Sequence, residues 1–106
     1  MKILITGGAG CLGSNLIEHW LPNGHEIFVI DNFATGKREV VPDVKGLTVV
    51  EGSVANAELV NNCFEKFKPE IVIHSAAAYK DPENWVEDAT TNVIGSAIVA
   101  RAAKAN

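Results

Sequence analysis

Near its N-terminus the chain reads Thr6-Gly7-Gly8-Ala9-Gly10-Cys11-Leu12-Gly13, directly after the apolar run Ile3-Leu4-Ile5. Two glycine patterns overlap there: G-x-G-x-x-G begins at Gly8 and G-x-x-G-x-x-G begins at Gly7. The residues from about 11 to 20 carry apolar side chains at helical spacing and predict a helix. A glycine turn between a buried strand and a helix lets backbone N–H groups approach a pyrophosphate. The stretch therefore predicts a dinucleotide-binding unit, the alternative being a glycine-rich turn that binds nothing.

The rest of the chain alternates short apolar runs with longer helical stretches, which is typical of an α/β protein with a parallel sheet. The predicted strands are unbroken apolar runs, so helices should cover both faces of the sheet. We expect strands at about 3–5, 27–30, 47–50 and 71–73, and helices at about 11–20, 55–67 and 85–106. This alternation predicts a Rossmann-type doubly wound parallel sheet, whose first four strands lie in the order 3-2-1-4 with flanking helices.

Finer expectations concern the second and third predicted helices. Ser53 precedes the second helix and is expected to be its N-cap. Asn92 and Gly95 disfavour a helix interior, so we expect the last helix to approach another group closely there. The alternative is an exposed asparagine beside a packing glycine. The positions of the last helix expected to face the core are Val86, Ala89, Val93, Ala97, Ala100 and Ala103.

Length and composition limit the class of protein. With 106 residues, 47% of them hydrophobic and 21% charged, the chain has room for one small globular domain. A formal net charge of -4 argues against binding to nucleic acid or to an anionic membrane. The apolar runs are too short for a membrane span or a signal peptide, so we expect a cytoplasmic protein. Cys11 and Cys63 match no metal-ligand spacing and are expected to be free thiols.

Asp31 closes the second predicted strand, where a carboxylate can accept both hydroxyl groups of an adenosine ribose. The same charge would repel a 2′-phosphate, so Asp31 favours NAD over NADP. Lys37 and Arg38 are close by in the sequence and could bind a 2′-phosphate, but Asp31 argues against that use. The alternative for Asp31 is a turn residue that accepts hydrogen bonds from its own loop.

Small residues follow the fourth predicted strand, in the stretch His74-Ser75-Ala76-Ala77-Ala78. Their size keeps the carboxyl end of the sheet open for a dinucleotide, since ligands of open α/β sheets bind at that edge. The alternative is that the alanines allow close packing of the next helix. His74 itself is expected to be a structural histidine rather than an acid or base.

These segments together resemble the extended short-chain dehydrogenase/reductase superfamily and, within it, the NAD-dependent nucleotide-sugar epimerase/dehydratase family. The resemblance rests on the glycine loop, Asp31-Asn32, His74-Ser75-Ala76-Ala77 and Asn92-Val93-Ile94-Gly95, and it covers the whole chain. It implies NAD as the cofactor. The residues that it places around NAD are Gly7, Gly10, Cys11, Leu12, Gly13, Asp31, Asn32, Phe33, Thr35, Gly36, Ser53, Val54, Ala76, Ala77, Ala78, Lys80 and Asn92.

The resemblance also implies what these residues do. The glycines form the loop, Cys11 and Leu12 supply backbone near the pyrophosphate, and the segment from Asp31 to Gly36 surrounds the adenosine ribose. The three alanines flank the cofactor, Lys80 reaches a phosphate and Asn92 contacts the dinucleotide. The family usually has an aspartate near adenine after the third strand. Here Ser53 stands at that position, followed by Val54, and its hydroxyl can still bond the adenine amino group.

The chemistry of this family uses a Tyr-x-x-x-Lys pair, in which the tyrosine is a base and the lysine lowers its pKa. The chain has one tyrosine, Tyr79, and Glu83 stands four residues later, so no catalytic residue is assigned. We therefore expect residues 1–106 to be the N-terminal part of an NAD(P)-binding domain in a longer, homodimeric enzyme. The resemblance implies a nucleotide-sugar substrate and transient hydride transfer to NAD at a sugar ring carbon. The alternatives are an inert NAD(P)-binding redox sensor or regulatory module, or a simple NAD(P)-dependent reductase.

Overall fold

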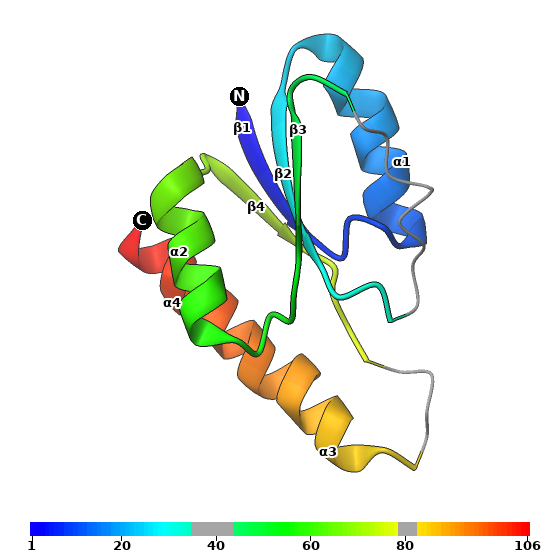
Figure 1. The fold of residues 1–106 in the computed structure, drawn as a ribbon, viewed down its shortest axis with the longest axis vertical. Helices are drawn as coiled ribbons and strands as arrows, with labels where there is room; N and C mark the ends of the chain where they lie inside the picture. The colour runs from blue at the N-terminus through cyan, green and yellow to red at the C-terminus, as the bar shows by residue number, and fades with distance from the viewer. Residues whose placement is uncertain (35–43, 79–82) are drawn as a thin grey trace.

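One parallel sheet organises the chain (Figure 1). The computed structural model describes residues 1–34, 44–78 and 83–106. Within them, the strands are β1 (Lys2–Thr6), β2 (Glu26–Asp31), β3 (Leu47–Glu51) and β4 (Ile71–His74). Their order is β3-β2-β1-β4 and every neighbouring pair is parallel, which confirms the predicted topology. The carboxyl ends of these strands therefore lie at one edge of the sheet, where the glycine loop follows β1.

Helices cover both faces of the sheet, as the apolar strands predict (Figure 1). Helix α1 (Cys11–Trp20) lies on one face, and α2 (Ala57–Phe67) and α4 (Ser96–Ala105) lie on the other. A short 3₁₀ turn, η1 (Leu21–Asn23), follows α1. In the three stretches that the structure describes, no helix has the length and apolar character needed to cross a bilayer.

Helix α2 begins later than the sequence predicts. Its N-cap is Asn56, whose side-chain oxygen accepts the Leu59 N–H at 3.1 Å. The expectation that Ser53 is the N-cap is wrong, because the Ser53 hydroxyl accepts the Ala55 N–H at 3.1 Å instead. Both residues satisfy turn N–H groups, and a serine three positions before an asparagine offers two possible starts for one helix.

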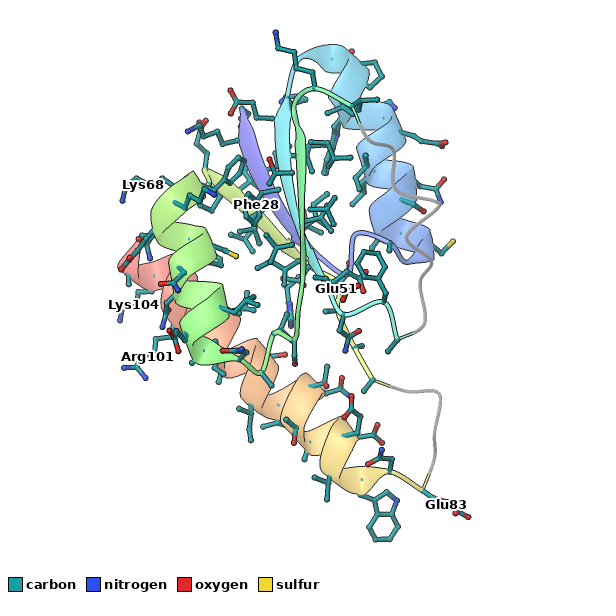
Figure 2. The ribbon with its side chains drawn as sticks, in the orientation of Figure 1. Phe28, Glu51, Lys68, Glu83, Arg101 and Lys104 are labelled. Carbon is teal, nitrogen blue, oxygen red and sulfur yellow. The ribbon has the colours of Figure 1, made fainter. Side chains whose placement is uncertain are left out.

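The side chains of each strand alternate between two cores. Ile3 and Ile5 of β1 pack with Ile17 of α1, whereas Leu4 points to the opposite face and packs with α2 and α4. Phe28 of β2 also points toward α2 (Figure 2), where its ring centroid lies 5.1 Å from that of Phe67. Burial on both faces fixes the register of the two inner strands and so the position of the loops that follow them.

The last helix is continuous but contains a π-helical segment that the sequence did not indicate. Here α3 (Trp85–Asp88) passes into η3 (Ala89–Gly95), and η3 passes into α4. A π-helix has wider turns than an α-helix, so it shifts the face that a regular spacing would present to the core.

The predicted buried face of this helix is wrong. Every residue expected to face the core is exposed: Val86, Ala89, Val93, Ala97, Ala100 and Ala103. The residues that the helix buries are Thr91, Gly95, Val99 and Ala102. An alanine-rich helix has several faces of similar hydrophobicity, so the larger Val99 selects the face that packs on the sheet. The charged Arg101 and Lys104 point away from the sheet on the outer side (Figure 2).

Candidate functional site

The glycine loop between β1 and α1 folds tightly on itself. Gly7 has a φ of 73°, which favours glycine, and its N–H donates to the Ile30 carbonyl oxygen at 2.8 Å. The Gly10 N–H donates to the Gly7 oxygen at 3.0 Å. A Cβ on Gly13 would lie 2.5 Å from the Gly7 oxygen and 2.6 Å from Gly8 Cα, so α1 can pack on the loop only with glycine there. The tight turn and the close helix packing that the motif predicts are therefore both present.

The N-terminus of α1 follows this loop directly. Gly10 is the N-cap and has no side chain with which to cap the helix, and the first turn contains no acidic residue. The N–H groups and the dipole at such a helix end favour an anion. The helix start therefore has the electrostatic character that a pyrophosphate site requires.

Asp31, at the end of β2, connects two loops through its carboxylate. One oxygen accepts the Ala9 N–H at 2.9 Å and the other accepts the Phe33 N–H at 2.7 Å. The Phe33 bond is the local turn bond that we considered as an alternative, and the Ala9 bond ties Asp31 to the glycine loop. A carboxylate has about four acceptor sites, so each oxygen keeps a lone pair for a ligand.

These segments border a cleft of about 460 Å³ at the carboxyl edge of the sheet. Small-molecule sites typically span roughly 300–1,000 Å³. Among the described residues, no lysine or arginine lines the cleft, so the N–H groups at the α1 N-terminus would have to hold an anion there. The predicted site residues that line it are Gly7, Gly10, Cys11, Leu12, Gly13, Asp31, Asn32, Ser53, Val54, Ala76, Ala77 and Ala78. We call the last three the alanine wall.

The other predicted site residues do not line this cleft or lie outside the described residues. Thr35, Gly36 and Lys80 belong to the second group. Phe33 is not part of the lining. Asn92 is not part of the cleft lining either. Its amide binds the backbone of Ala78 instead: Nδ2 donates to the Ala78 oxygen and Oδ1 accepts the Ala78 N–H, each at 2.8 Å.

The sequence reasoning missed one side of the cleft, which α3 and η3 provide. Ala34, which belongs to the segment predicted to surround the ribose, also lines the cleft, and the lining residues that were not predicted are Ile30, Gly52, Ser75, Asn84, Glu87, Asp88 and Thr91. A signal for the helical ones existed in Gly95, whose Cβ would lie 2.6 Å from Val54 Cγ2 and so confirms the expected close approach. Thr91, Asp88 and Asn84 precede Gly95 at helical spacing, so they share the face that approaches the cleft.

His74 and the cysteines lie in different surroundings. His74 Nδ1 is 2.6 Å from the Thr6 hydroxyl oxygen, its Nε2 is 3.0 Å from that of Ser96, and burial lowers its pKa. Cys11 and Cys63 are both free, as predicted. Cys11 is exposed in the cleft, whereas burial raises the pKa of the Cys63 thiol. A buried thiol with a raised pKa is seldom ionised and therefore reacts poorly, so we interpret Cys63 as a core residue.

Residues 3–106 match the NAD dependent epimerase/dehydratase family. The chain belongs to this family. Membership confirms the resemblance seen in the sequence, and the parallel sheet with its glycine loop is the fold that it implied. The epimerase/dehydratase family is NAD-dependent, as its name states, so the electrostatic character of the α1 N-terminus agrees with the family assignment.

Solved structures and relatives support this assignment over nearly the full chain. The Bordetella bronchiseptica enzyme WbmG, crystallised with NAD, is 71% identical and matches 99% of this chain and 34% of its own with a TM-score of 0.98. The UDP-glucose 4-epimerase of Thermus thermophilus in complex with NAD is 38% identical, with a TM-score of 0.89 over 99% of this chain and 34% of its own. The UDP-glucose 4-epimerase of Mycolicibacterium smegmatis is 32% identical over 98% of this chain and 35% of its own length. The chain thus spans about a third of the length of these relatives.

Proposed function

We propose that the chain is the NAD-binding portion of an enzyme that epimerises or dehydrates a nucleotide sugar. The observation that carries this proposal is the cleft where the α1 N-terminus, Asp31 and the alanine wall meet. It is supported by the NAD complexes of WbmG and of the T. thermophilus epimerase, and by the complex of WbmG with NAD and UDP. A longer, homodimeric enzyme that acts in the cytoplasm, without a nucleic-acid or membrane partner, is part of the same proposal.

Each part of NAD has a complementary group in the cleft. The pyrophosphate would lie at the α1 N-terminus, beside the backbone of Gly10, Cys11 and Leu12. The adenosine ribose would donate its hydroxyl protons to Asp31, whose charge also disfavours the 2′-phosphate of NADP. Ser53 has one lone pair left beside its bond to Ala55, and that lone pair would accept a proton of the adenine amino group.

The chemistry of the whole enzyme would then depend on the other half of the dinucleotide. Bound NAD supplies a transient hydride acceptor for a ring carbon of the sugar. The residues of this chain would bind and orient the adenosine and pyrophosphate, while the alanine wall would flank the cofactor without adding a charge of its own. We assign no catalytic acid or base here, because Tyr79 is followed at the fourth position by Glu83 instead of lysine.

A second candidate is a regulatory or redox-sensing module that binds NAD(P) without chemistry, since the cleft of this chain would bind the dinucleotide in either case. The gene sequence downstream of Asn106 discriminates between the two. A Tyr-x-x-x-Lys pair there supports the enzyme, and a reading frame that ends or continues without one supports the module.

Calorimetric titration of the chain with NAD tests the binding itself. We expect saturable binding, and we expect Gly10→Val to abolish it, because a side chain at Gly10 would enter the space of the pyrophosphate. A Cβ there would meet only the Gly7 oxygen, at 3.3 Å, so the variant should still fold. Ala103→Val is the matched control, since Ala103 is exposed on α4 and does not line the cleft. Full NAD affinity in Gly10→Val would refute the proposed position of the pyrophosphate.

A further inference from the structure

Both ends of the alanine wall are held by side chains from other elements. At one end, the Ala76 N–H donates to the hydroxyl oxygen of Thr6 at 3.2 Å. At the other end, Ala78 exchanges two hydrogen bonds of 2.8 Å with the Asn92 amide. The three alanines have no polar side-chain atoms, so these backbone bonds determine where the wall stands relative to the glycine loop.

His74 lies between the two anchors and joins them. Its Nδ1 is 2.6 Å from the hydroxyl oxygen of Thr6, which holds Ala76. Its Nε2 is 3.0 Å from the hydroxyl oxygen of Ser96, and that hydroxyl donates to the Asn92 carbonyl oxygen at 2.7 Å. The network therefore runs from Ala76 through β1, β4 and α4 to Asn92 in η3, and returns to the wall at Ala78.

The direction of each hydrogen bond follows from the number of protons available. A serine hydroxyl has one proton, and Ser96 gives it to a carbonyl oxygen, which can only accept. Ser96 must then accept from His74 Nε2–H. On the other side, the proton of Thr6 is free to donate to His74 Nδ1, because Thr6 accepts from the Ala76 N–H. Of the two neutral tautomers, only the one with its proton on Nε2 satisfies all these bonds, because the other would leave Ser96 facing a nitrogen without a proton. Partial burial lowers the pKa of His74, which favours the neutral ring over the imidazolium.

We propose that His74, as the neutral tautomer with its proton on Nε2, is a positioning residue that fixes the alanine wall of the cofactor cleft. The imidazole touches neither the cleft nor the proposed cofactor; it acts through Thr6 on Ala76 and through Ser96 on the backbone of Asn92. The expected effect on NAD affinity rests on the proposed function, whereas the tautomer of His74 does not. One experiment therefore tests the hydrogen-bond network without NAD, and a second tests its effect on NAD affinity.

The first experiment reads the tautomer by nitrogen NMR of the ¹⁵N-histidine-labelled chain without ligand, above the pKa of His74. We expect the Nε2 resonance of His74 at the shift of a protonated nitrogen and the Nδ1 resonance at that of an unprotonated acceptor. In Thr6→Val, which has no hydroxyl proton to donate, the Nδ1 resonance should move. A proton on Nδ1, or a rapidly exchanging mixture of tautomers, would overturn the proposal whatever NAD does.

The second experiment compares NAD affinity in paired variants. Thr6→Val keeps the shape of a fully buried strand residue but loses both network bonds, and we expect about tenfold weaker binding. Thr6→Ser keeps the hydroxyl and should bind within about twofold of the original chain, which a merely space-filling role for Thr6 would not give. His74→Gln retains one amide that can donate to Ser96 and should fall between them. His19→Gln is the control, because His19 is exposed like His74 but takes no part in the network.

The outcomes of the second experiment are distinct. Equal affinity in Thr6→Val, His74→Gln and the original chain would overturn the positioning role, as would equal loss in Thr6→Ser and Thr6→Val. If Thr6→Val fails to fold, the comparison of His74→Gln with His19→Gln decides the question. If the original chain itself does not bind NAD, the proposed function and the positioning role fail together, and the tautomer measurement still shows whether the network exists.

Discussion

At the scale of single residues, Asp31 combines two roles that the sequence presents as alternatives. Its oxygens accept N–H groups from Ala9 and Phe33, so the side chain organises the glycine loop and its own turn. It is buried, but it lines the cleft, where a bound ligand would meet it. The two roles are compatible because a carboxylate accepts more than two hydrogen bonds.

We predict that Asp31→Asn weakens NAD binding about tenfold, since the ribose would lose a charge-assisted hydrogen bond. NADP binding should weaken less or improve, because the variant removes the charge that repels the 2′-phosphate. Titrating the variant with each dinucleotide gives the ratio of the two dissociation constants. Glu51→Gln is a matched control: Glu51 is the register partner of Asp31 on β3, but it does not line the cleft. Equal losses for NAD and NADP would contradict the assignment of Asp31 to the ribose.

At the scale of elements, α2 begins with a cap that the structure defines. The Asn56 side chain accepts the Leu59 N–H at 3.1 Å, and Lys68 ends the helix with a φ of 52°. We predict that Asn56→Ala lowers the free energy of unfolding by about 1 kcal/mol, because one N–H of the first turn loses its partner. Urea denaturation measures this difference.

The control for the cap is Asn61→Ala, in the same helix and on its exposed side. Alanine has the higher helix propensity, so this variant should be as stable as the original chain or slightly more stable. A loss of stability in Asn61→Ala as large as in Asn56→Ala would mean that the cap is not responsible.

The sequence allowed the sheet to be predicted because its strands are apolar runs separated by glycine, proline and a recognisable loop. For the helix over 85–105, the same reasoning predicted the wrong buried face. Its alanines fit several faces equally well, and a π-helical segment cannot be read from residue spacing. The cleft residues Glu87, Asp88 and Thr91 were missed for the same reason, because their place depends on how that helix lies on Val54. The amide of Asn92 shows the same limit: spacing marked it as important, but only the structure shows that it binds Ala78.

At the scale of the whole molecule, the stability of the chain should depend on the protonation of His74. The side chain of His74 is exposed to solvent, but its partial burial still lowers its pKa in the folded chain below the ordinary value of 6.5. The groups that face it from β1 and α4 are the uncharged Thr6 and Ser96. The unfolded chain then binds the proton more readily than the folded chain. The contribution of His74 is therefore complete above pH 6.5 and is lost as the pH falls through its lowered pKa.

Urea denaturation from about pH 8 to about pH 5 measures this dependence. Other groups also titrate in this range, so the informative quantity is the difference between the original chain and His74→Gln. We expect that difference to shrink as the pH is lowered, and we expect His19→Gln to follow the original chain. A difference that grows on acidification would contradict the assigned direction.

The cleft takes its lining from the carboxyl ends of β1, β2, β3 and β4, from the start of α1 and from α3 and η3, which are far apart in the sequence. A partly folded chain that has paired only some of these strands cannot present the complete site. NAD would then bind the folded form alone, and a concentration 100 times the dissociation constant would add about 2.7 kcal/mol to the free energy of unfolding. The amount of free dinucleotide in the surroundings would therefore set how long the polypeptide survives proteolysis and heat.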